Sequence, residues 1–493
     1  MLTKAKSKTN MQNRKFIILL RPEFGTAITR AYRQVNPPIG LGYIASYLAK
    51  HGYKVKIFDL ALRAIEDDAL FYYIERTKPI FVGLSALTAY YDELRKLSLK
   101  LRDHFPNLTI MLGGVHVSSL PKISLKECKA DYLVQGEGEQ ILLEFLDAKA
   151  NNRNVNDIDG LVYIEGDEVI CNPRHELISD LDGIPFPDWK QINPNLYPRN
   201  PHGILLKRKM VAPILASRGC PFNCHYCASC RFWGQKIRFR SPENVVDEIQ
   251  YLHEEFGIRE IHFWDDNLTM KRSHIIGICK EIISRGLHHM RFSTPNGVRV
   301  DTLDYKIMRY MKAAGFYAMT FAVESGEKKI LRENGKLMDL KKIIKNTVVA
   351  KKLGFLLNSY FMVGFPGDSE KTIRKTIQFA KSVPFDYRTF FLLKPLPGSK
   401  IFSEWTKGKD MLDFDWNGLS SYMQANRFVL KELSSDYLEK IHKKAHSENI
   451  LRIPGLIKLL FISLTHFHFS QLKFEIERII HIFFGYNVSV FNS

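Results

Sequence analysis

Four of the seven cysteines in this 493-residue chain lie in one short segment, SRGCPFNCHYCASC, at residues 217–230. Cys220, Cys224 and Cys227 are spaced so that their thiolates can hold three corners of a cubane iron–sulfur cluster, which leaves the fourth iron without a protein ligand. Such an open iron can bind a substrate. The residues that follow Cys230 do not predict a turn that returns it to the other three, so we expect it not to be a ligand.

A zinc site is the alternative interpretation of these cysteines. Structural zinc sites usually pair two CxxC-type hooks across a longer separation, and Cys128, Cys171 and Cys279 are scattered singly. The chain starts with a polar segment rather than a basic and then apolar leader, which predicts a cytoplasmic protein. In that compartment clustered cysteines indicate metal ligands or redox thiols rather than disulfides.

The cysteines directly follow the first of six apolar runs that alternate with helical patterns from residue 211 onwards. The runs are APILAS, EIHFWD, RFSTPN, FYAMTFAVES, LLNSYFMVG and YRTFFLLKP. Six such units predict a (β/α)6 partial TIM barrel, in which the chemistry collects at the carboxyl ends of the strands. The cysteines are therefore expected on that rim.

The first third of the chain predicts a second α/β domain, a doubly wound, five-stranded parallel sheet with helices on both faces. Ligands of such sheets bind at the carboxyl ends of the strands, where the loops Ser85–Thr88 and Gly113–Ser118 would lie. The sequence GLVYIEGDEVI predicts a hairpin, and GIPFPDW a linker. The predicted order is a basic tail (1–14), this domain (15–155), the hairpin and linker (156–205), the barrel (206–410) and a helical C-terminal region (411–493).

Composition and charge limit the class of protein. The chain is 45% hydrophobic and 25% charged, which excludes disordered, collagen-like and disulfide-scaffold proteins. The formal net charge is +19, and two stretches contribute much of it. Residues 1–40 contain eight Lys and Arg residues and one acidic residue, and residues 201–240 contain eight Lys and Arg residues and no acidic residue. These stretches are either a solvated tail and a basic loop, or a patch that receives an anionic substrate or cofactor. The apolar runs of the C-terminal region predict helices packed on the barrel, with peripheral membrane contact as the less favoured alternative.

The stretch CPFNCHYC resembles the CxxxCxΦC signature of radical S-adenosylmethionine enzymes, with Tyr226 as the aromatic residue. The resemblance implies that the open iron of a [4Fe–4S] cluster chelates S-adenosylmethionine, and that one electron cleaves the sulfonium to give a 5′-deoxyadenosyl radical. It also implies an electron donor such as flavodoxin or ferredoxin. Residues that the resemblance assigns to this cofactor are Asp265, Asp266 and Asn267 near its amino group, Glu324 as an orienting residue, and Gly364 near the adenine.

The N-terminal half resembles the cobalamin-binding domain of one branch of that family. No DxHxxG motif, whose histidine ligates cobalt, occurs in the chain. His116 is therefore expected to pack against the corrin or to hydrogen-bond its side chains rather than to bind cobalt. The residues assigned to cobalamin by this resemblance are Pro38, Gly40, Ser85, Thr88, Gly113, Gly114, His116, Gly136 and Glu137.

Together the resemblances imply an enzyme that methylates an unactivated carbon of a small metabolite. Radical cyclisation, rearrangement or oxidative cyclisation are the alternatives in the same family. Methylthiolation is disfavoured, because it requires a second cluster from three cysteines, and only Cys128 and Cys171 precede the barrel. A non-catalytic iron–sulfur or zinc module that binds RNA is the alternative of a different class, although no nucleic acid partner is expected.

Overall fold

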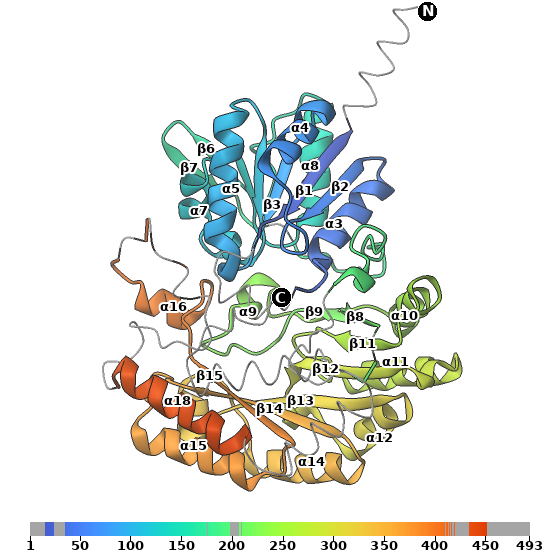
Figure 1. Ribbon diagram of the computed structural model, residues 1–493, viewed down its shortest axis with the longest axis vertical. Helices are drawn as coiled ribbons and strands as arrows, with labels where there is room; N and C mark the ends of the chain where they lie inside the picture. The colour runs from blue at the N-terminus through green and yellow to red at the C-terminus, as the bar shows by residue number, and fades with distance from the viewer. Residues whose placement is uncertain are drawn as a thin grey trace, which may run out of the picture.

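The protein contains two α/β domains with the cysteine segment between them (Figure 1). The computed structural model describes residues 15–23, 35–174, 176–197, 207–208, 210–409, 411, 412, 414, 416, 419 and 433–450. The predicted basic tail at 1–14 and the apolar runs after residue 450 lie outside the described residues.

The N-terminal sheet contains seven strands in the order β2-β1-β3-β4-β5-β6-β7. The first five are parallel, as predicted. The predicted hairpin does not stand apart: β6 pairs antiparallel with β5, so the sheet is mixed. This pairing covers the edge that β5 would otherwise expose. The strands are β1 (Phe16–Arg21), β2 (Lys54–Asp59), β3 (Val82–Ser85), β4 (Ile110–Gly113), β5 (Tyr132–Val134), β6 (Leu161–Glu165) and β7 (Glu168–Cys171).

Helices cover both faces of this sheet, as expected for a doubly wound domain. One face packs against α3 (Ile39–Lys50) and α8 (Gly138–Ala150). The other packs against α4 (Asp67–Thr77), α5 (Tyr91–His104) and α7 (Pro121–Glu127). The short helix α6 (Val115–Ser119) follows β4 directly and lies at the carboxyl edge.

The second sheet has six parallel strands in the order β15-β14-β13-β12-β11-β8. In the part of the chain that the structure describes, β8 and β15 do not pair, so the barrel is partial, as predicted. The strands are β8 (Val211–Ile214), β11 (Glu260–Phe263), β12 (Arg291–Val298), β13 (Phe316–Glu324), β14 (Leu356–Val363) and β15 (Tyr387–Leu392). The intervening helices are α10 (Pro242–Phe256), α11 (Arg272–Ser284), α12 (Tyr305–Ala313), α13 (Lys328–Glu333), α14 (Leu340–Lys352) and α15 (Glu370–Ser382).

Helix α10 has a capped first turn. The Ser241 side chain accepts a hydrogen bond from the backbone of Asn244 at 3.1 Å, and Pro242 occupies the first helical position. Gly257 ends the helix with a φ of 66°.

The described part of the C-terminal region contains a helix packed on the barrel. Helix α18 (Ser435–Ile450) runs along β15 (Figure 1). His442 and His446 both hydrogen-bond through Nε2 to the carbonyl oxygen of Phe390, at 2.8 and 2.7 Å. Among the described residues we find no helix with the length and apolar character needed to cross a bilayer.

The segment that links the two domains packs against both of them. Trp189 is 1% exposed, and its Nε1 donates to Glu248 Oε1 on α10 at 2.9 Å. The amide of Asp188 donates to the carbonyl of Gly42 on α3 at 3.0 Å. A Cβ on Gly42 would lie 2.6 Å from Ile192 Cδ1, so glycine permits this close contact.

Replacing Trp189 by alanine is therefore expected to lower the free energy of unfolding by about 3–5 kcal/mol, because it leaves a large cavity and an unpaired Glu248 oxygen. The loss is measured as a lower thermal transition by circular dichroism. Leu196, which is 65% exposed, provides the control: Leu196→Ala should change stability by no more than about 0.5 kcal/mol. A thermal transition at the wild-type temperature in Trp189→Ala would show that the linker does not hold the two domains together.

Candidate cluster and cofactor site

A short two-stranded ladder closes the base of the cysteine loop. Strand β9 (Ser217–Arg218) precedes the loop, β10 (Arg238–Phe239) follows it, and the two pair antiparallel. Gly219 begins the loop with a φ of 98°, and a Cβ there would lie 2.8 Å from the carbonyl oxygen of Lys236. The loop therefore leaves the barrel rim through a turn that only glycine tolerates.

The three predicted cluster ligands are half-buried and form no disulfide. Burial raises the pKa of the Cys220 thiol to about 11 and that of Cys227 to about 12, so both are protonated at neutral pH until a metal displaces the protons. The Cys227 sulfur already accepts a hydrogen bond from the Ser229 amide at 3.4 Å. No group of three or more His, Cys, Asp or Glu residues in the described chain is arranged to hold a single metal ion.

Cys230 has a different environment from the other three. It lies within α9 (Ser229–Phe232), is 6% exposed, and its sulfur lies 3.8 Å from Asn223 Oδ1. Its exclusion from the cluster stays a prediction.

Tyr226 anchors the loop to the barrel. Its ring packs at 69° against Phe365, with 5.4 Å between centroids, in a cluster that includes Leu393 and Ile401. The backbone of His225 is bonded on both sides, to the carbonyl of Asn334 and from the amide of Ile401, both at 3.0 Å. The aromatic residue of the signature therefore has a structural use beside any contact with a cofactor.

The segment WDDN (residues 264–267), which follows β11, lies beside the cysteine loop, but its three polar residues have different environments. Asp265 is 2% exposed and accepts hydrogen bonds from Ser217 Oγ at 2.5 Å and from the Ala216 amide at 3.2 Å. Burial raises the pKa of Asp265 to about 6 despite these bonds. Asn267 is fully buried. Asp266 alone is exposed; it accepts a hydrogen bond from Ser229 Oγ at 2.5 Å.

Glu324 and Gly364 stand on the same rim as the cysteine loop, at the ends of β13 and β14. Glu324 has a φ of 71° next to a bulge, an uncommon conformation that clusters at functional sites. Lys336 holds it by donating to Oε1 at 2.9 Å. Gly364 has a φ of 91°, and its amide donates to Asp368 Oδ2 at 3.0 Å. The predicted contacts of these residues with S-adenosylmethionine stay predictions.

Arg299 was not predicted from the sequence, although it touches the cysteine loop. It follows β12, is 7% exposed, and its guanidinium carbon lies 3.7 Å from the ring centroid of Phe222. Its Nε and Nη2 donate to Asp301 at 3.0 and 2.7 Å. A lone arginine in a strand-end loop carries no sequence signal of its own, because its partner Phe222 is distant in the chain.

The residues assigned to cobalamin gather at the carboxyl edge of the N-terminal sheet. Gly114 has a φ of 102°, and a Cβ there would lie 2.8 Å from the carbonyl oxygen of Ala86, so glycine allows the loops after β3 and β4 to touch. Gly113 is different: a Cβ on it would meet no atom of the described part of the chain within 4 Å. Gly40 near the start of α3 is equally open, and Pro38 directly precedes that helix. Ser85 Oγ lies beside Gly114.

His116 is enclosed by protein. It stacks on Tyr91 with 3.9 Å between ring centroids, meets Trp416 edge-on at 4.6 Å, and shares a hydrogen bond of 3.2 Å between Nδ1 and Thr88 Oγ1. Burial lowers the pKa of His116 to about 3, so the ring is neutral. Its Nε2 is buried and has no hydrogen-bond partner among the described residues. The structure thus brings Thr88 and His116 together, and a contact of either with the corrin stays a prediction.

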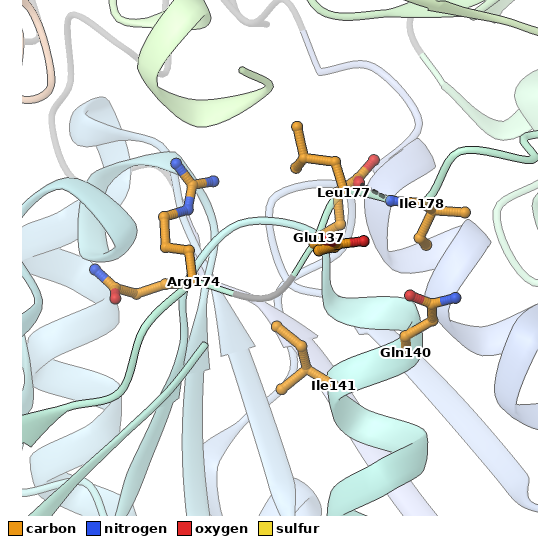
Figure 2. A pocket seen from close by; sticks show the side chains of 8 residues that line it. Glu137, Gln140, Ile141, Arg174, Leu177 and Ile178 are labelled. Atoms are coloured by element: carbon orange, nitrogen blue, oxygen red, sulfur yellow. Dashed lines mark hydrogen bonds between the residues drawn. The ribbon is translucent and has the colours of Figure 1, made fainter. Parts of the chain in front are cut away.

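The Glu137 carboxylate binds the two strands that flank the cysteine loop. The residue is 8% exposed and accepts hydrogen bonds from Arg218 and Arg238. It also accepts one from the Ile178 amide at 3.0 Å (Figure 2). Arg240 is likewise buried and pairs with Glu248 at 2.5 Å. Three of the eight basic residues of 201–240 are therefore neutralised inside the protein, so this stretch is not a continuous anion-binding patch.

The comparisons with known proteins agree with this geometry. Residues 25–146 match the B12 binding domain family and residues 214–380 match the Radical SAM superfamily. An uncharacterized methyltransferase of Pyrococcus horikoshii is 32% identical over 90% of this chain and 94% of its own length. The chain belongs to the cobalamin-binding radical S-adenosylmethionine enzymes.

Other members of this family differ in reaction. The anaerobic magnesium-protoporphyrin IX monomethyl ester cyclase of Rubrivivax gelatinosus is 27% identical over 85% of this chain and 75% of its own length. The structure of the radical S-adenosylmethionine methyltransferase TsrM from Kitasatospora setae, with cobalamin and a [4Fe–4S] cluster bound, has the same fold. It superimposes with a TM-score of 0.67 at 19% identity and covers 80% of this chain and 75% of its own.

Family membership makes the protein a radical S-adenosylmethionine enzyme whose cofactors are a [4Fe–4S] cluster, S-adenosylmethionine and cobalamin. The residues present fit these groups. Three thiols without disulfide partners lie at the barrel rim, and the carboxyl end of β4 has room at Gly113 that a side chain would fill. Such an enzyme also needs a reductant for its cluster and a substrate.

Proposed function

We propose that the protein is a C-methyltransferase that acts on an unactivated carbon of a small metabolite. When bound, the cofactors supply a 5′-deoxyadenosyl radical for hydrogen abstraction and a methyl group for transfer. The observation that carries the proposal is the position of the cysteine loop, which lies between the barrel rim and the N-terminal sheet (Figure 1). A substrate bound there is within reach of both cofactor sites.

Within this proposal the protein's own residues bind and orient. Cys220, Cys224 and Cys227 hold the cluster, and the exposed carboxylate of Asp266 accepts from the amino group of S-adenosylmethionine. Glu324, held by Lys336, orients the same cofactor. The open edge at Gly113 receives the corrin.

The similarity to the relative from Pyrococcus horikoshii, which is called a methyltransferase, supports methylation over the other reactions. A radical cyclisation or rearrangement is the second candidate, and the 27% sequence identity to the Rubrivivax gelatinosus cyclase favours it. The cytoplasm, with flavodoxin or ferredoxin as electron donor, is the proposed setting for either reaction. Family membership argues against the non-catalytic metal or RNA-binding module.

The test is an anaerobic incubation of the reconstituted protein with a metabolite extract and S-adenosylmethionine that carries an isotope-labelled methyl group. Methylation predicts one new product with the label on carbon, together with 5′-deoxyadenosine and S-adenosylhomocysteine, by mass spectrometry. Cyclisation predicts 5′-deoxyadenosine and an unlabelled product. The Cys224→Ala protein, incubated in parallel, identifies products that do not depend on the cluster. An unlabelled product would overturn the proposal of methyl transfer.

A further inference from the structure

Two arginines face each other at the base of the cysteine loop. Arg218 is the last residue of β9, Arg238 is the first of β10, and they are direct partners in the ladder. Both are buried, with 6% and 5% exposure. Like charges directly opposite on paired strands repel, and a buried cation without a partner is costly, so this ladder requires carboxylates.

The cobalamin-binding domain supplies those carboxylates. Glu137, in the loop between β5 and α8, accepts from Arg218 Nη1 at 2.8 Å and from Arg238 Nη1 at 2.6 Å. Glu139, in the first turn of α8, accepts from Arg218 Nη2 at 2.7 Å. Burial acts to raise the pKa of Glu137, but the two arginines outweigh it and hold that pKa below its ordinary value. The carboxylate is therefore charged and bridges the two strands.

Aromatic rings fix the Arg218 guanidinium between them. Its carbon lies 5.1 Å from the ring centroid of Tyr43 on α3 and 5.4 Å from that of Trp233, just after α9. Arginine suits this position, because its planar group stacks on rings while its fork reaches two carboxylates. A lysine would satisfy neither requirement fully.

A second contact ties the far side of the loop to the same domain. Arg174, which follows β7, donates to the carbonyls of Arg231 and, at 2.6 Å, Phe232 at the end of α9. Arg174 and Glu137 line two sides of one small pocket (Figure 2). A Cβ on Gly136 would lie 2.6 Å from Arg174 Nη2, so the glycine before Glu137 makes room for this contact.

We propose that Glu137 is a positioning residue that sets the geometry between the two cofactor sites. It lies in the loop after β5, at the edge of the sheet where the corrin is expected, and it holds the strand that leads into Cys220. The cluster loop is thus built on the cobalamin-binding domain as well as on its own barrel. This inference goes beyond the proposed methyl transfer, because it concerns cofactor geometry and holds for any reaction of the family.

The test uses the protein loaded with its cluster and with cobalamin, each reduced to its paramagnetic state, without substrate. Electron paramagnetic resonance then measures the magnetic interaction between cluster and cobalt, which depends on their separation and orientation. Wild type is expected to give one resolved splitting, and Glu137→Gln to lose it at equal iron and cobalt content. Arg218→Lys, which keeps the charge but not the two-sided contact, is expected to do the same.

Glu260→Gln is the control, because it replaces a fully buried carboxylate at the amino end of β11, where Glu260 accepts a hydrogen bond from the Tyr317 hydroxyl at 2.6 Å. It should keep the wild-type splitting. Failure of Glu137→Gln and Arg218→Lys to retain a cluster, with Glu260→Gln fully loaded, also supports the proposal. A wild-type splitting in both Glu137→Gln and Arg218→Lys, or an equal loss in Glu260→Gln, would overturn it. The methylation assay does not affect any of these outcomes, because the spectra are recorded without substrate. A failure of the proposed function can therefore be distinguished from a failure of this inference.

Discussion

Cys224→Ala is expected to abolish the cleavage of S-adenosylmethionine to 5′-deoxyadenosine. The cluster has three protein ligands in this account, so the loss of the central thiolate leaves it held by two. Iron and sulfide content after anaerobic reconstitution and 5′-deoxyadenosine by liquid chromatography measure the effect. The loss should be complete, because Cys230 is expected not to be a ligand and therefore not to substitute for Cys224.

Cys230→Ala is the control for that experiment. Its sulfur lies within α9 and 3.8 Å from Asn223 Oδ1, and it is less exposed than the three ligands. Cluster content and cofactor cleavage should remain close to wild type. A Cys230→Ala protein without a cluster would mean that this cysteine is a fourth ligand and that the iron is not open.

Gly113→Leu is expected to weaken cobalamin binding without unfolding the domain. The leucine side chain would enter the open space at the end of β4, where no atom of the residues that the structure describes lies within 4 Å of its Cβ. If the corrin occupies that space, its affinity should fall at least about tenfold, which is ~1.4 kcal/mol. Titration of the metal-free protein with hydroxocobalamin measures the affinity, and circular dichroism measures the thermal transition.

Two other glycines separate a blocked site from a damaged fold. Gly166, in the β6–β7 turn, is as open as Gly113 but lies away from the strand ends, so Gly166→Ala should bind cobalamin normally. Gly114→Ala places its Cβ 2.8 Å from the Ala86 carbonyl at a φ of 102°, so it should lower both stability and affinity. Wild-type affinity in Gly113→Leu would place the corrin elsewhere.

The sequence predicted the strands and the rim of the barrel well, because both depend on local signals. Buried strands are short apolar runs, and strand-end motifs such as Cys220–Cys227 follow them directly. The pairing of β6 with β5 was not predicted, because nothing local distinguishes a free hairpin from one that extends a sheet. Sheet edges are a property of the assembled fold.

Side-chain partners in the site were harder to predict. Glu137 was assigned to cobalamin from its loop, yet its carboxylate bridges arginines that lie 81 and 101 residues away in the chain. Asp265 and Asp266 are neighbours of the same type, but one is buried under Ser217 and the other is exposed. Residue type and spacing predict which groups reach a rim, whereas the packed structure decides which of them remain available to a ligand.

Mössbauer spectroscopy of the iron-57-reconstituted protein tests most directly whether one corner of the cluster lacks a protein ligand. One iron site is expected to become distinct from the other three when S-adenosylmethionine is added, because its amino and carboxylate groups bind there. Four iron sites that remain equivalent and unchanged on this addition would contradict it.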